Sequence, residues 1–147
     1  MEVRKVYEFL KRPKKLNNEI KRLEMIRAEI YSCLYPGAIR YDKDRVITTP
    51  QNVLEEKYAE VDEMDRRIDA LRMERIEAIT IISSVIECLP ADKDREKRVL
   101  AEFYIGNKPM KRIAREMIYS DKHIYRLRKD AVRDLARQIK TDQFWED

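Results

Sequence analysis

The sequence contains few of the residues that usually interrupt helices, with only two glycines and five prolines among 147 residues. Together with a charged fraction of 41%, this scarcity predicts an all-α protein built from long, charged helices. Long apolar runs are also lacking. None approaches the roughly 20 residues that span a bilayer, and residues 1–6 lack the apolar core of a signal peptide. We therefore expect a soluble, cytoplasmic protein.

Residues that perform catalysis or bind metals are equally scarce. His123 is the only histidine, which excludes most histidine-based triads and metal sites. The two cysteines, Cys33 and Cys88, have no ligand partner nearby in the sequence, and in the cytoplasm they are expected to stay reduced. There is also no glycine-rich phosphate loop and no carboxylate pair among apolar neighbours. We expect no enzymatic activity, no cofactor and no bound metal.

Two long amphipathic helices are predicted in residues 1–90. In the first, Arg27 is the only polar member of a series with spacings of four and three, which comprises Leu16, Ile20, Leu23, Ile30 and Leu34. Tyr35-Pro36-Gly37 ends this helix, and the second is expected to be capped by Thr49 and opened by Pro50. Its series comprises Leu54, Val61, Met64, Ile68, Leu71, Ala78, Ile82, Val85 and Leu89. Matched series joined by one loop predict an antiparallel hairpin, a coiled-coil-like interaction region.

Two segments of the predicted hairpin depart from a simple pair of helices. The stretch from Glu2 to Lys11 is expected to pack on the part of the second helix that the first does not cover, offset by a break at Pro13. Ile79 to Ile86 is rich in β-branched residues, which favours a strand, but its apolar spacing continues that of the preceding helix. We therefore predict helix there, with a surface that also contacts the C-terminal region or a second copy of the chain.

Residues 94–140 are predicted to form a small helical domain after a linker at Ala91–Asp94. Its helices are expected at 96–105, at 109–117 and from Ser120 onward, with Gly106-Asn107 as a turn. Ser120 is a favourable N-cap because its hydroxyl accepts a hydrogen bond from a free backbone N–H, and Asp121 suits the positive end of the helix dipole. Two short helices joined by a tight turn predict a helix-turn-helix. Residues 141–147 form an acidic, aromatic tail.

Charge is distributed unevenly along the chain. Residues 1–93 contain 18 basic and 18 acidic residues, whereas residues 94–140 contain 14 basic and 7 acidic residues. Residues 141–147 add three acids, so the net charge of +4 originates in residues 94–140. A localised excess of positive charge is what phosphate contact requires, and we therefore expect double-stranded DNA as a partner.

The helix that begins after Ser120 separates an apolar side from a basic side. The apolar side consists of Ile124, Leu127, Ala131 and Leu135. The opposite row consists of Lys122, Arg126, Lys129, Arg133, Arg137 and Lys140. Solvated helix faces usually mix both signs of charge, so a row of one sign favours DNA contact over a bland solvated surface.

Roles within this region follow from reach into the groove. Residues in the first turns of a recognition helix meet base edges, so base readout is predicted for Asp121, Lys122, His123 and Arg126. Phosphate contacts that set the docking angle are predicted for Lys111, Arg112, Arg115, Arg128, Lys129 and Arg133. For His123, a solvent-exposed position without a functional role is as well supported as a contact with a guanine or a phosphate. For Tyr125, a packing role is at least as well supported as a phosphate contact.

Several stretches of residues 94–140 together form a family pattern, namely Arg98-Val99-Leu100, Phe103-Tyr104-Ile105, Lys111 to Met117, Tyr119-Ser120 and Ile124 to Leu127. This pattern resembles region 4 of the sigma-70 family. With the helical pair in front, nearly the whole chain is similar to small phage-encoded regulators of the ArpU and RinA type. The resemblance implies a transcription regulator of a phage or prophage, associated with the bacterial nucleoid, that binds promoter DNA and acts on host RNA polymerase. Ile118 stands where the family's turn usually carries glycine, so a differently shaped turn is expected here.

Other functions are compatible with the same pattern. A DNA-recognition subunit of a phage packaging terminase also joins a helix-turn-helix to a helical oligomerisation segment. A helical adaptor could instead use the hairpin to bind polymerase, a sigma factor or a second copy of the chain. Phe144 and Trp145 are expected to fold back onto a groove of the protein, with a docking peptide for a partner as the alternative.

Overall fold

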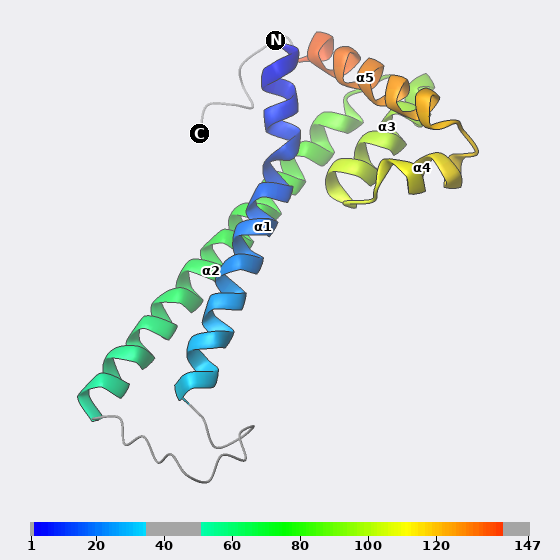
Figure 1. Ribbon diagram of the computed structural model, residues 1–147. Helices are drawn as coiled ribbons and strands as arrows, with labels where there is room; N and C mark the ends of the chain where they lie inside the picture. Colours follow the sequence, from blue (N-terminus) through cyan, green and yellow to red (C-terminus); the bar gives the residue numbers. More distant parts are fainter. Residues whose placement is uncertain (1, 35–50, 140–147) are drawn as a thin grey trace. The chain divides into compact units, whose positions relative to one another are not determined.

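The computed structural model describes residues 2–34 and 51–139, and every regular element in these ranges is helical. The elements are α1 (Val3–Leu34), α2 (Gln51–Glu87), the 3-10 turn η2 (Ala91–Lys93), α3 (Asp94–Leu100), the π-helix η3 (Ala101–Ile105), α4 (Met110–Met117) and α5 (Asp121–Gln138). The predicted all-α class is confirmed. So is the long hairpin: α1 and α2 run side by side in opposite directions, followed by a group of short helices (Figure 1).

Helix α1 continues through Pro13, so the predicted break there is wrong. A proline in a helix interior lacks the N–H that would bond to the carbonyl four residues earlier, here that of Phe9. The side chain of Pro13 is nevertheless less than 2% exposed, and Leu10 and Leu16 on either side are buried as well. Burial of these side chains along one stripe therefore keeps the helix continuous despite the missing hydrogen bond.

Helix α2 includes the β-branched stretch from Ile79 to Ile86, which confirms the helix predicted there. Ala78, Ile82 and Val85 on its inner side are buried, as the apolar spacing indicated. On the outer side, the hydroxyls of Thr80 and Ser84 donate to backbone carbonyls one turn earlier. The predicted start at Thr49-Pro50 and the turn at Tyr35-Pro36-Gly37 lie outside the described residues.

The described residues group into two compact units. We call the parts within 1–16 and 74–147 the head unit, and those within 17–73 the hairpin unit. Each long helix contributes one portion to each unit. The boundaries inferred from sequence, 1–90, 94–140 and 141–147, divide the chain by expected function and stay predictions.

The head unit contains the larger apolar core. Its main cluster joins the start of α1, the end of α2, the α3–η3 segment and the second half of α5, through Val6, Phe9, Leu10, Ile82, Val85, Ile86, Leu89, Leu100, Tyr104, Ala131, Val132, Leu135, Ala136 and Ile139. A second cluster lies between α3, α4 and the start of α5, and comprises Val99, Met110, Ile113, Ala114 and Ile124. Helix α5 therefore belongs to both clusters, and its position is fixed along its whole length.

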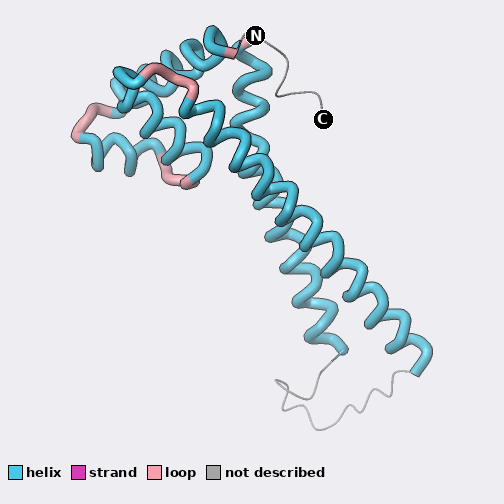
Figure 2. The backbone as a smooth tube through the Cα atoms, turned by 180° about the vertical axis from the view of Figure 1, so that it is seen from behind, coloured by secondary structure: helices cyan, strands magenta, loops and turns pink. Residues whose placement is uncertain are grey.

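Short connections join the successive helices from α2 to α5 (Figure 2). The predicted linker at Ala91–Asp94 is instead the 3-10 turn η2, which leads directly into α3. Between η3 and α4 the chain turns at Gly106 and Asn107, and Asn107 has a positive φ of 54°. A Cβ atom on Gly106 would lie 2.8 Å from the carbonyl oxygen of Glu102, so this position requires glycine.

The hairpin unit has a narrower core, made of Ile20 and Leu23 on α1 and Ile68 on α2, with Met64 and Leu71 packed against it. Arg27, the polar member of the α1 series, hydrogen-bonds to the carboxylate of Asp65 on α2. That hydrogen bond raises the pKa of the Arg27 guanidinium above its usual value. The interruption of the apolar series is therefore filled by an ion pair that crosses between the helices.

Candidate nucleic-acid interface

The turn between α4 and α5 consists of Ile118, Tyr119 and Ser120. Ile118 has φ 59° and ψ 47°, the left-handed conformation that usually ends a helix at a glycine. The N–H of Ile118 donates to the carbonyl of Arg115 at 3.3 Å, and the N–H of Tyr119 donates to that of Ala114 at 2.9 Å. These are the hydrogen bonds of a Schellman motif. The expectation of a differently shaped turn is wrong in this respect, because isoleucine adopts the geometry that glycine normally supplies.

Ser120 caps α5, as the sequence predicts. Its hydroxyl accepts a hydrogen bond from the backbone N–H of His123 at 3.2 Å, and its own φ of −69° and ψ of 156° are those of an N-cap residue. The ring of His123 lies against that of Tyr119, with centroids 4.5 Å apart, and the guanidinium of Arg95 lies 5.9 Å from the Tyr119 ring. The start of the predicted recognition helix is therefore held by both backbone and side-chain contacts.

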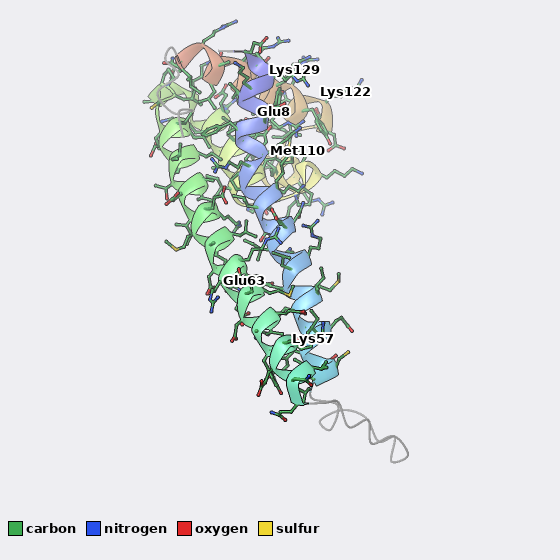
Figure 3. All side chains as sticks on the ribbon, turned by 90° about the vertical axis from the view of Figure 1, so that its left-hand side faces the viewer. Glu8, Lys57, Glu63, Met110, Lys122 and Lys129 are labelled. Carbon is green, nitrogen blue, oxygen red and sulfur yellow. The ribbon has the colours of Figure 1, made fainter. Side chains whose placement is uncertain are left out.

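The basic row of α5 lies on the surface. Lys122, Arg126, Lys129 and Arg133 are all exposed, and none of the four forms an ion pair with another described residue. Figure 3 labels Lys122 and Lys129 on this helix. Arg137 extends the row, exposed and 3.9 Å from the carboxylate of Asp134, whereas Lys140 lies outside the described residues. On the inner side, Ile124, Ala131 and Leu135 are fully buried and Leu127 is half-buried.

The basic residues of α4 fall into two groups. Lys111 and Arg115 are exposed and have no ion-pair partner among the described residues. Arg112 instead donates from Nε to Glu116 at 3.1 Å, and the ammonium of Lys108 also contacts Glu116 at 3.1 Å. The hydrogen bond from Lys108, followed by that from Arg112, lowers the pKa of the Glu116 carboxyl. Arg112 is therefore already engaged within the head unit.

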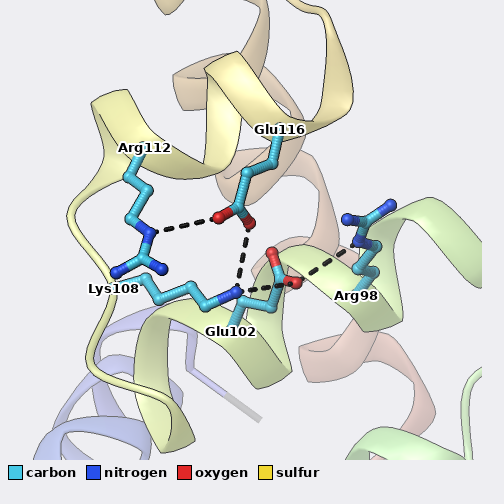
Figure 4. Close-up of polar contacts among 5 residues, drawn as sticks. All are labelled: Arg98, Glu102, Lys108, Arg112 and Glu116. Carbon is cyan, nitrogen blue, oxygen red and sulfur yellow. Dashed lines mark hydrogen bonds and ion pairs between the residues drawn. The ribbon is translucent and has the colours of Figure 1, made fainter.

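Lys108 connects this group to a second carboxylate (Figure 4). Its ammonium lies 3.4 Å from Glu102 on η3, and Glu102 also accepts from Nε of Arg98 on α3 at 3.4 Å. The resulting chain of ion pairs links α3, η3, the turn after it and α4. The sequence did not single out Lys108, because its role depends on two acids that are brought together only by the fold.

Arg128 occupies a different environment from the basic row. Its guanidinium lies 4.6 Å from the ring centroid of Phe103 and 5.4 Å from that of Tyr125, and its Nε is buried without a hydrogen-bond partner. These contacts hold η3 against α5. The sequence could have predicted this difference. Arg128 follows Lys122 by six residues and lies about 240° around the helix from it, so the two side chains cannot share one face.

The structure thus places the predicted site residues in two environments. Asp121, Lys122, His123 and Arg126 are exposed at the start of α5, and Lys111, Arg115, Lys129 and Arg133 are exposed on α4 and further along α5. Arg112 is exposed as well but is paired with Glu116, whereas Arg128 is half-buried against Phe103. Electrostatically, the exposed set has one anionic member, Asp121, in the first turn of α5, where the helix dipole favours it.

Within residues 2–34 and 51–139, no three or more His, Cys, Asp or Glu side chains gather as metal ligands. None of the helices there is both long enough and apolar enough to cross a membrane. Comparison with known proteins finds no matching family model, no similar curated protein and no similar solved structure.

Proposed function

We propose that this chain is a sequence-specific DNA-binding transcriptional regulator of phage or prophage type, similar to region 4 of sigma-70 factors and acting with host RNA polymerase. The observation that carries the proposal is the exposed row of Lys122, Arg126, Lys129 and Arg133 on α5. Such a row lies on the second helix of a capped helix-turn-helix and forms no ion pairs within the described part of the protein. It is suited to the major groove of DNA, which is wide enough to admit an α-helix and is bordered by phosphates.

In this proposal α5 enters the major groove by its N-terminal end. Lys122 and Arg126 donate hydrogen bonds to base edges, His123 contacts a guanine or a phosphate, and Asp121 accepts from the amino group of cytosine. Outside the groove, phosphate contacts come from Lys111, Arg115, Lys129 and Arg133. Arg112 and Arg128 have a smaller part in binding, because their guanidinium groups already have partners in the head unit.

The hairpin supplies the second half of the proposed activity. Residues 1–93 are neutral overall, and the ion pairs of the hairpin unit join α1 to α2, so this unit offers little attraction for DNA. We assign it to contact with host RNA polymerase or with a second copy of the chain. Neutrality supports that assignment, because a protein partner does not require the excess positive charge that a phosphate backbone does.

The proposal is tested by measuring duplex binding by fluorescence anisotropy at several salt concentrations. The probes are a random duplex and a duplex that the protein selects from a random library. We expect affinity to fall steeply with salt, with a slope of about −0.9 per phosphate contact. Arg126→Ala should weaken the selected duplex about tenfold and the random duplex much less, whereas Lys129→Ala should weaken both alike.

Arg67→Ala is the matched control, because it removes one exposed arginine from the hairpin unit, where it pairs with Glu19. Its DNA affinity should equal that of the wild-type protein. Absence of binding to any duplex at low salt, or an equal loss from Arg67→Ala and Arg126→Ala, would contradict the proposal. Transcription by host polymerase from a template carrying the selected duplex then tests the regulatory part, since the protein should change the amount of transcript.

A further inference from the structure

Ile118 combines two unfavourable features in one residue. It is one of two described residues other than glycine with positive φ, and the other, Asn107, is of a type that tolerates this conformation. A β-branched residue with left-handed geometry is a genuine outlier. The side chain of Ile118 is also 90% exposed, the most exposed of the large apolar residues in the described part of the chain.

The fold gives no reason for isoleucine at this position. Its side chain belongs to none of the apolar clusters, whereas the neighbouring Tyr119 packs against the cluster beneath α4 and α5. The hydrogen bonds of the turn use only backbone atoms of Ile118, so glycine would form them without strain. Backbone strain of this kind is characteristic of positions where the side chain serves binding.

The residues around Ile118 indicate what it binds. Arg115 precedes it by three residues and Lys122 follows it by four, and both are exposed without an ion-pair partner among the described residues. An exposed apolar side chain flanked along the chain by two unpaired cations matches a ligand surface that is anionic overall and carries an apolar group. In the major groove of DNA, the 5-methyl group of thymine is that apolar group.

We propose that Ile118 packs against thymine methyl groups in the major groove and makes the protein prefer A·T pairs beside the bases that Lys122 and Arg126 read. This inference rests on the proposed function and adds a specificity-determining residue to it. It also explains why the turn keeps a strained residue: glycine would relieve the backbone but would remove the apolar contact.

The test compares two duplexes and three proteins by fluorescence anisotropy. The duplexes are the sequence selected by the wild-type protein from a random library and the same sequence with every thymine replaced by uracil, which removes only the methyl groups. The proteins are the wild type, Ile118→Gly and Ile118→Val. Gly is favoured at this helix end, so the first variant stays folded, and valine retains the β-branch and most of the apolar surface.

We expect Ile118→Gly to bind the thymine duplex about fourfold more weakly, because one methyl contact worth about fourfold is lost. Replacing thymine by uracil should weaken the wild type and Ile118→Val about fourfold, and Ile118→Gly hardly at all. Met25→Ala is the control for loss of an exposed apolar side chain and should bind as the wild type does, since Met25 is 63% exposed in the hairpin unit.

Two results would overturn the inference while leaving the proposed function intact. One is equal affinity of Ile118→Gly and the wild type for the thymine duplex. The other is an undiminished loss on uracil replacement in Ile118→Gly, which would assign the methyl contact to another residue. Failure of the wild-type protein to bind any duplex at low salt is a separate result, and it overturns the proposed function together with this inference.

Discussion

The hairpin unit and the exposed row Lys122, Arg126, Lys129 and Arg133 of the head unit use charged residues in opposite ways. In the hairpin unit, arginines pair with acids on the facing helix, as in Arg67 with Glu19 at 3.3 Å and Arg72 with Glu24 at 2.6 Å. In the head unit, the basic row of α5 has no such partners among the described residues. Paired charges largely cancel at a distance, whereas a row of one sign creates a field that reaches a ligand. Similar residue types therefore join helices in the hairpin unit and around Lys108, whereas along α5 they have no partner within the described part of the fold.

The two units also differ in how they are held together. The hairpin unit relies on a narrow stripe of apolar residues and on exposed ion pairs, each of which contributes little to stability. The head unit has a core to which α1, α2, the α3–η3 segment and α5 all contribute. The DNA-binding surface that we propose requires such a support, because side chains that contact a ligand must be positioned before the ligand arrives.

Removal of apolar bulk from each unit should give the largest contrast. Leu10 and Leu23 lie on the same helix, but Leu10 is fully buried in the head unit and Leu23 lies in the narrow core of the hairpin unit. We expect Leu10→Ala to lower the free energy of unfolding by about 3 kcal/mol, and Leu23→Ala by less, because its surroundings can collapse around the smaller side chain. Urea denaturation measures both, and equal losses would contradict the contrast.

Alkaline pH should affect the head unit through Tyr104. Burial raises the pKa of Tyr104 from 10 to about 12. The stability that the protonated Tyr104 hydroxyl contributes is therefore complete below pH 10 and is lost as the pH rises to about 12. The reason is that the phenol of Tyr104 ionises at a lower pH in the unfolded chain than in the folded protein. The free energy of unfolding of Tyr104→Phe minus that of the wild type should therefore be about 2 kcal/mol larger at pH 12 than at pH 7. Thermal unfolding monitored by circular dichroism against pH measures this, and parallel pH profiles would count against it.

Loss of the cap at the start of α5 should have a smaller effect. Ser120→Ala removes the hydrogen bond to the N–H of His123 and should cost about 1 kcal/mol. Ser84→Ala in α2 is the matched control, because Ser84 donates to a carbonyl within a helix, where alanine is at least as favourable. Chemical denaturation should therefore separate the two serines. Equal effects would show that Ser120 does not act as a cap in solution.

The smallest effect is expected in the hairpin unit at Glu19, which contacts Arg67 at 3.3 Å and Arg22 at 3.9 Å. Glu19→Gln should lower stability by about 0.5 kcal/mol at low salt and by less at 1 M salt, because exposed pairs are screened. Glu29→Gln is the control, since Glu29 is exposed on the same helix and takes part in no ion pair among the described residues. A loss above 2 kcal/mol would mean that ion pairs dominate the stability of this unit.

Local patterns in the sequence were sufficient to predict much of this structure. The helices, the Ser120 cap and the basic row of α5 depend on apolar spacing and capping chemistry, which act within a few residues. For the same reason, the helical conformation of Ile79 to Ile86 followed from its spacing. The sequence signals for these features therefore lie within a few residues of each other.

Features that depend on distant contacts were predicted poorly. Burial maintains the helix at Pro13, although the residue type alone favours a break. The contacts of Arg128 with Phe103 and of Arg112 with Glu116 could not be anticipated either, because the fold brings these partners together, and the phosphate contacts predicted for the two arginines stay predictions. The left-handed conformation of Ile118 likewise follows from the path between α4 and α5 and opposes the preference of isoleucine.

The main core of the head unit brings together residues that are synthesised far apart in time. Val6, Phe9 and Leu10 leave the ribosome early, but their partners Leu135 and Ile139 follow more than 100 residues later. During that interval the start of α1 lacks the part of its core that α5 supplies, and contacts of such long sequence separation form slowly. The head unit therefore completes its main core only after α5 has emerged, and until then the incomplete core leaves apolar side chains exposed to non-native contacts.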